Sequence, residues 1–244
     1  MLWHWSAHWL PPASPHWPLI TRLGEAALLL PCAVLLCLWL RYGGQKESAV
    51  RWIQVCAVAS LLTLLSKLAF LGWGVSLPGL NFTGVSGHSM LAALVLPALM
   101  HHLALGAGPQ AGPASIAGKG LAGAALGIGL AVLVGMSRLA LQAHSFSEVL
   151  AGLVLGFSAC FVFLAGSRQG TRRRPSRALL AAIAVLALGV PVTRIELPTQ
   201  HWLERIAVYL SDIASPLHRK PSAAPPPAMH PHWQKHMARY RERV

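Results

Sequence analysis

The stretch SRLALQAHSFSE, residues 137–148, lies between two long apolar runs of this 244-residue chain. It contains an arginine at position 138, a histidine six residues later and a carboxylate four residues after that. Arg138 is suited to bidentate binding of an anion, and His144 to the role of nucleophile or general base. On a helix, Glu148 would lie one turn from His144 and fix the tautomer of its ring. The stretch therefore predicts a site that handles an anion.

A second polar island, SGHS at residues 86–89, lies between two other apolar runs. Its position predicts the start of a helix, where backbone amides bind anions. Lys67 falls in the last two turns of the preceding apolar run, and its long side chain can extend toward the same surface. The two islands together predict one pocket, in which Arg138, Lys67 and the amides hold a phosphate while His88 protonates the leaving oxygen.

The composition is that of an integral membrane protein. Hydrophobic residues make up 55% of the chain and charged residues 11%, against about 25% in a soluble domain. Of the seven acidic residues, only Glu148 lies beside a polar island. A two-metal phosphatase needs several converging carboxylates, so the sequence predicts neither a metal nor another cofactor. The four cysteines all fall in apolar runs and are expected to be buried free thiols.

Six apolar runs predict an all-α fold, a polytopic membrane bundle of about six transmembrane helices. They cover residues 23–40, 52–73, 88–105, 121–136, 149–165 and 178–192. Two of these runs contain glycines four residues apart, a spacing that lets helix backbones approach closely. We interpret these glycines as packing residues: Gly123, Gly127, Gly152 and Gly156.

The composition divides the chain into four segments. Residues 1–22 are rich in Trp and His, which indicates either an interfacial anchor or a metal-binding tract, and we favour the anchor. The bundle is expected over residues 23–193. Residues 194–214 have apolar positions at helical spacing and predict an amphipathic helix on the membrane surface. Residues 215–244 are basic and Pro-rich, as is typical of disordered tails.

The basic residues are clustered, although the net charge is +13. We interpret the clusters as topology determinants and contacts to membrane lipids, and we expect no nucleic-acid partner. The loops after the first and fifth runs hold three and five basic residues, whereas the loops after the second and fourth hold none and one. The positive-inside rule then places both islands on the periplasmic or extracytoplasmic side of the inner (plasma) membrane. Six crossings would leave the basic tail on that side too, unless the short sixth run does not cross.

Three motifs resemble those of the type 2 phosphatidic acid phosphatase family. The third motif, Ser-Arg-(five residues)-His-(three residues)-Asp, is present at the family spacing with Glu148 in place of Asp. The second, Pro-Ser-Gly-His, is present as residues 85–88 with Val85 in place of Pro. The first, Lys-(six residues)-Arg-Pro, keeps Lys67 but has Gly74 and Val75 at the Arg-Pro positions.

The resemblance implies a membrane-embedded helical bundle that hydrolyses lipid phosphates or diphosphates through a phosphohistidine. It also implies His144 as the nucleophile, His88 as the general acid, and Arg138 and Lys67 as phosphate ligands. Phosphate contacts are further predicted for Ser86, Gly87 and Ser137, although Ser137 could equally cap the following turn.

Two alternatives stay open: a lipid phosphotransferase that uses the same site, and a non-catalytic protein that keeps the bundle. The sequence predicts no oligomeric state.

Overall fold

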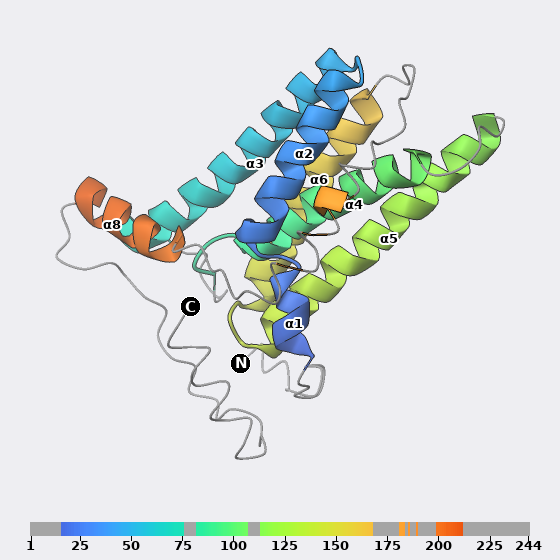
Figure 1. Ribbon diagram of the computed structural model, residues 1–244. Coiled ribbons are helices and arrows are strands. Elements are labelled where there is room, and N and C mark those ends of the chain that lie inside the picture. Colours follow the sequence, from blue (N-terminus) through green and yellow to red (C-terminus); the bar gives the residue numbers. More distant parts are fainter. Residues whose placement is uncertain are drawn as a thin grey trace.

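The computed structural model describes residues 16–75, 82–106, 113–167, 181–183, 185, 189 and 199–211. The elements within these residues are helices (Figure 1). In chain order they are α1 (Trp17–Arg22), α2 (Ala26–Tyr42), α3 (Lys46–Trp73), α4 (Gly87–Gly106), α5 (Pro113–Ala140), α6 (Phe146–Gly166) and α8 (Thr199–Ser211). The expected all-α class is confirmed.

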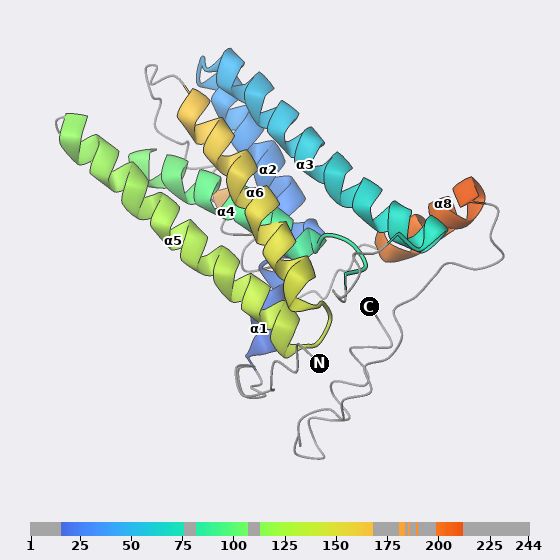
Figure 2. The ribbon, with the colours of Figure 1, turned by 180° about the vertical axis from the view of Figure 1, so that it is seen from behind.

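Helix α4 is the centre of the bundle, with α2, α5 and α6 packed around it (Figures 1 and 2). Almost every residue from Ser89 to Leu99 is buried, because this helix is apolar on all sides. The outer helices instead keep large apolar side chains on their outward faces, as a surface in contact with lipid requires. On α3 these are Val50, Ile53, Val58, Leu61, Leu62 and Leu65.

Within the described residues, four helices are long and apolar enough to cross a membrane: α3, α4, α6 and the part of α5 from Gly118 to Ala140. Helix α2 has 17 residues, about 26 Å at the usual helical rise, a little less than the bilayer core of about 30 Å. Five of the six predicted apolar runs are therefore helices of one bundle. Most of the sixth run lies outside the described residues, but Ile183 belongs to the buried core.

One difference from the sequence prediction concerns α5, which begins at Pro113 rather than after Gly120. Proline is favoured at the first position of a helix, since its missing N–H has no helical partner there. The segment expected as a loop is therefore largely the first two turns of a long helix.

The packing role of the four glycines is confirmed. A Cβ on Gly127 would collide with the backbone of Pro97, and one on Gly123 with the carbonyl of Met100, so both let α5 lie directly against α4. A Cβ on Gly156 would collide with the Met90 carbonyl, and one on Gly152 would lie 2.6 Å from the Ser86 carbonyl oxygen. These contacts join α6 to the start of α4, where the second polar island lies.

Gly127→Ala and Gly129→Ala should have opposite effects on stability, although both positions are on α5. A Cβ on Gly127 would overlap α4, and overpacking of this kind costs about 1–3 kcal/mol. A Cβ on Gly129 meets nothing within 4 Å, so alanine should stabilise the helix by about 0.5–1 kcal/mol. Thermal unfolding of the purified protein in detergent measures both. Equal shifts for the two variants would contradict the α4–α5 packing.

Helix α8 lies across the end of α3, as Figure 1 shows. Its residues Leu203 and Ala207 pack on Leu68 and Leu71 near the end of α3. The predicted apolar face is thus divided, because Ile206 and Leu210 are exposed together with Tyr209. An exposed apolar strip with a tyrosine suits the headgroup level, where we expect α8 to lie. The tail, residues 215–244, is outside the described residues.

Candidate active site

Both polar islands lie at one end of the bundle, where α3 and α5 end and α4 and α6 begin (Figure 2). The amide of Ser86 donates a hydrogen bond to the carbonyl oxygen of Glu148, at 3.1 Å. Electrostatic interactions connect His88 with Arg138, His144 and Lys67. The predicted meeting of the two islands is therefore present in the structure. Lys119 lies near the other end of α5, about 30 Å from Arg138 at the helical rise.

The spacing from Arg138 to Glu148 follows from two helix-end motifs in series. Helix α5 ends in a Schellman turn: the Ala143 amide donates to the Arg138 carbonyl at 3.0 Å, and Gln142 adopts a φ of 53°. Two residues after that turn, α6 begins with a capping box in which Ser145 and Glu148 bond each other's backbone amides. The turn and the cap leave His144 between them, and they fix where its side chain starts.

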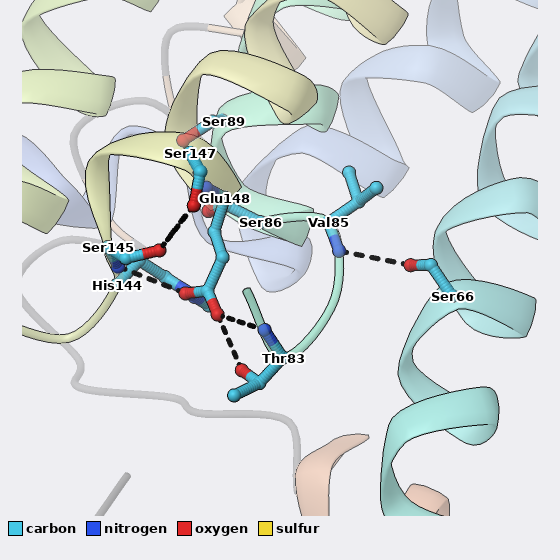
Figure 3. Close-up of polar contacts among 9 residues, drawn as sticks. All are labelled: Ser66, Thr83, Val85, Ser86, Ser89, His144, Ser145, Ser147 and Glu148. Atoms are coloured by element: carbon cyan, nitrogen blue, oxygen red, sulfur yellow. Dashed lines mark hydrogen bonds and ion pairs between the residues drawn. The ribbon is translucent and has the colours of Figure 1, made fainter. Parts of the chain in front are cut away.

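Glu148 orients the ring of His144. Nδ1 of His144 lies 2.8 Å from Oε2 of Glu148 (Figure 3). The same oxygen accepts the amide hydrogen of Ser145 at 3.0 Å, so we assign the donor role to Nδ1–H. The carboxylate is fully buried, whereas the histidine side chain keeps 16% of its exposure. Nε2 is therefore the nitrogen left to meet a substrate.

The other oxygen of Glu148 is held by Thr83. Its Oε1 accepts from the Thr83 amide at 2.7 Å and from the Thr83 hydroxyl at 2.5 Å (Figure 3). Each carboxylate oxygen thus accepts two hydrogen bonds, which suits an ionised carboxylate kept in one orientation. Sequence reasoning assigned no role to Thr83, because nothing in a connector indicates which hydroxyl will contact a carboxylate 65 residues away.

Burial lowers the pKa of His144 from 6.5 to about 4, against the opposing effect of the hydrogen bond that its ring donates to Glu148. The positive charges of Arg138 and Lys67 act in the same direction as burial. His144 lies in the loop between α5 and α6, and it is accordingly a neutral imidazole at neutral pH. An unprotonated Nε2 is what a nucleophile requires.

The lowered pKa predicts how His144 reacts with diethyl pyrocarbonate, which modifies only neutral imidazole. At pH 5, about 90% of a group with a pKa near 4 is neutral, against about 3% of an ordinary histidine. We expect the modification rate of the His144 peptide, followed by mass spectrometry, to stay nearly constant from pH 7 to 5. It should fall near pH 4. A midpoint near 6.5, as for N-acetylhistidine in the same tube, would contradict the burial of the ring.

Lys67 is placed by the loop that leads into α4. A Cβ on Gly84 would lie 2.9 Å from the Cγ and 3.1 Å from the Cα of Lys67, so the loop backbone contacts the lysine directly. Gly84 also has a φ of +132°, a backbone angle that residues with a side chain rarely adopt. One residue on, the Val85 amide donates to the Ser66 hydroxyl at 3.0 Å (Figure 3). Lys67 interacts electrostatically with Arg138 and Glu148.

The positions where the first motif lacks its Arg-Pro pair coincide with the end of α3 in the structure. Gly74 is the C-cap of α3, with a φ of 68° in the left-handed region. Its amide and that of Val75 close the last turn on the carbonyls of Phe70 and Ala69. An arginine at position 74 would adopt this conformation at a cost of about 1 kcal/mol. The chain therefore ends the helix where the family motif has its arginine.

Arg138 is 2% exposed and lies in the last turn of α5. Its Nη1 donates to the hydroxyl of Thr21 in α1, at 3.0 Å. Thr21 is fully buried and was missed by the sequence analysis, which assigned residues 1–22 to an interfacial segment. A lone threonine beside Trp and Pro carries no signal that it will contact an arginine 117 residues away.

Ser86 and Ser137, which the sequence predicts to contact phosphate, form hydrogen bonds within the protein. Ser137 donates its hydroxyl hydrogen to the Val134 carbonyl at 2.6 Å, which favours the structural interpretation of this residue. Ser86 accepts from the Ser89 hydroxyl at 3.1 Å, and its amide is engaged by Glu148 as described above. Gly87 and His88 open α4, where amides have no carbonyl one turn earlier. The Ser86 amide is therefore occupied within the protein, whereas those of Gly87 and His88 lie in the first turn of α4.

His101 and His102 lie near the far end of α4. Nδ1 of His101 is 2.9 Å from the Gly120 carbonyl oxygen, and Nδ1 of His102 is 2.8 Å from that of Ala98. The ring of His102 also stacks on Phe163. Both histidines thus have packing roles remote from the site.

The arrangement defines a class: a helical membrane protein with an oriented histidine near a buried arginine and a partly buried lysine. The sequence matches the PAP2 superfamily over residues 69–172. A Klebsiella pneumoniae protein described as "Uncharacterized 22.5 kDa protein in cps region" is 33% identical over 213 residues, covering 84% of this chain and 96% of that protein. No solved structure matches the chain.

The chain belongs to the PAP2 superfamily. Because this superfamily generally comprises phosphatases, membership supports a phosphatase-type function and, at a coarse level, phosphoester hydrolysis. The apolar helices fit a membrane protein.

Proposed function

We propose that this protein is a metal-independent membrane phosphatase that hydrolyses a lipid phosphate or diphosphate through a phosphohistidine on the extracytoplasmic face. The observation that carries the proposal is the hydrogen bond from His144 Nδ1 to the buried carboxylate of Glu148, at 2.8 Å. It holds the ring with Nε2 available, in a site that also contains Arg138, Lys67 and His88.

The reaction is proposed in two steps. First, the Nε2 lone pair of His144 attacks phosphorus, the bond from phosphorus to the leaving oxygen breaks, and His88 donates a proton to that oxygen. Glu148 then faces a cationic ring, which its negative charge stabilises. Second, water attacks phosphorus and gives a proton to His88, and the phosphorus–nitrogen bond breaks. Free phosphate leaves with both histidines restored.

Arg138, Lys67 and the first amides of α4 would stabilise charge on the phosphoryl oxygens. Glu148 is an acidic residue at this site, and its two carboxylate oxygens accept hydrogen bonds from Thr83, His144 and Ser145. A carboxylate so occupied favours chemistry that relies on cationic side chains rather than on a carboxylate-held metal.

A lipid substrate is supported by the position of the site at the end of helices whose outward faces are apolar. The test is phosphate release by purified protein from phosphatidate, phosphatidylglycerol phosphate and an isoprenyl diphosphate, with and without a chelator. We expect release from at least one lipid, undiminished by the chelator. A strict requirement for added divalent metal would contradict the mechanism.

A phosphotransferase would use the same first step and differ in what attacks the phosphohistidine. Labelled lipid phosphate decides between the two, since label recovered on an acceptor lipid indicates transfer and label recovered as free phosphate indicates hydrolysis. A non-catalytic role would be supported if wild-type release were no higher than that of His88→Ala across all three lipids.

The proposed orientation can be tested with two variants, each with one introduced cysteine in a protein whose four native cysteines are replaced by alanine. Phe146, at the site end of α6, is 68% exposed, and Tyr42, at the opposite end of α2, is 76% exposed. A membrane-impermeant maleimide added to intact cells should label Phe146→Cys and leave Tyr42→Cys unlabelled until the cells are opened. The reverse pattern would place the site in the cytoplasm.

A further inference from the structure

The short helix α1 belongs to the site end of the bundle, although it lies outside the residues 69–172 matched by the superfamily. It packs against α5 (Figure 1). Thr21, in its last turn, is fully buried, and its hydroxyl accepts a hydrogen bond from Arg138 Nη1 at 3.0 Å. Both partners of this bond are therefore buried.

The connection from α1 to α2 packs closely against α5 and α4 beside the site. A Cβ on Gly24 would lie 2.5 Å from Val134 Cγ1 on α5 and 3.4 Å from the Cβ of His88 on α4. Only a residue without a side chain fits such a gap. The close approach keeps Thr21 in place beside Arg138.

Thr21, which accepts the hydrogen bond from Arg138, carries no charge. A guanidinium has five N–H donors in a planar fork, and a partner at one of them fixes the plane of the group. A carboxylate in the place of Thr21 would offset the charge of the guanidinium, whereas the Thr21 hydroxyl orients the group and adds no negative charge.

We propose that Thr21 is a positioning residue for Arg138, and that α1 and its connection to α2 form a wall of the phosphate site. The inference rests on the proposed function, since it takes Arg138 to be a phosphate ligand. It extends the site to a segment that none of the three sequence motifs includes.

The test compares wild type, Thr21→Val, Thr21→Ser and Thr63→Val as purified full-length proteins, with inorganic phosphate as the competitive inhibitor. Thr63 is a matched control, because its buried hydroxyl bonds to the Ala59 carbonyl within α3. A hydrogen bond to a charged group is worth about a tenfold change or more. We expect Thr21→Val to raise the phosphate inhibition constant and KM about tenfold, and Thr21→Ser and Thr63→Val to change them less than about twofold.

A double-mutant cycle with Arg138→Lys separates positioning from a general structural role. If Thr21 acts through the guanidinium, Thr21→Val should have little further effect in the Arg138→Lys protein. Additive effects, or an unchanged inhibition constant in Thr21→Val, would overturn the inference. If Thr21→Val does not fold, Thr21→Cys supplies the comparison, since a thiol accepts hydrogen bonds weakly.

Failure of the inference and failure of the proposed function give different results. A wild type that releases no phosphate from any lipid refutes the function, and calorimetric titration with inorganic phosphate then still compares wild type with Thr21→Val. A wild type that hydrolyses lipid phosphate, with Thr21→Val indistinguishable from it, refutes the inference alone.

Discussion

His144→Ala should reduce phosphate release from the preferred lipid by at least about 10⁴-fold, the order seen when a covalent nucleophile is removed. No other imidazole is oriented by the carboxylate of Glu148, among the contacts of the described residues. The thermal unfolding temperature should fall only modestly, because the variant loses one hydrogen bond to the buried carboxylate of Glu148, which keeps its bonds to Ser145 and Thr83. Phosphate release at equal protein concentration checks the first expectation, and thermal unfolding in detergent checks the second.

The matched control is His101→Ala, which removes a histidine from the opposite end of α4. It should keep wild-type turnover. A positive control comes from His144→Gly, in which added imidazole can occupy the space of the missing ring and attack phosphorus itself. Partial rescue by imidazole would identify the lost group as a nucleophile, whereas substantial residual activity in His144→Ala would remove it from that role.

Glu148→Gln is expected to lower kcat by about 10⁴-fold, comparable with the loss of the orienting carboxylate in a catalytic triad. The amide keeps nearly the shape of the carboxylate. It has one acceptor oxygen, however, for donors that now come from Thr83, His144 and Ser145 on both oxygens. The ring of His144 would lose its fixed tautomer and the negative charge beside the phosphorylated imidazolium. Single-turnover measurements of phosphate release follow this step directly.

Two further variants test the role of the Glu148 carboxylate, one by a milder change and one as a control. Thr83→Val keeps the backbone amide bond to Glu148 and removes only the hydroxyl bond, so a loss of about tenfold is expected. Glu47→Gln, in the first turn of α3 at the far end of the bundle, is the control for removing a carboxylate. Equal activity of Glu148→Gln and Glu47→Gln would show that the carboxylate at position 148 has no part in catalysis.

The sequence predicted those parts of the site that lie on one helix or one turn. Arg138, His144 and Glu148 are close in the chain, and their spacing is set by the Schellman turn and the capping box between α5 and α6. Periodicity and apolar length likewise predicted the helices, because a membrane helix satisfies its own backbone and needs little tertiary information.

The contacts that the sequence did not predict join distant segments through single hydroxyls. Thr21 reaches Arg138 and Thr83 reaches Glu148 only after the bundle has formed. Neither residue has a spacing or a charge that distinguishes it from other threonines. The split face of α8 is a similar case, since periodicity showed which residues are apolar but not that Leu203 and Ala207 would pack on α3.

The most direct test of the central claim is to trap the phosphorylated enzyme. Wild-type protein is mixed with lipid carrying radiolabelled phosphate, quenched in alkali within one turnover, and digested for mass spectrometry. We expect label that is stable to base, labile to acid, attached to the peptide containing His144, and absent from His144→Ala. Rapid turnover with no labelled protein, or label on another residue, would contradict His144 as the nucleophile.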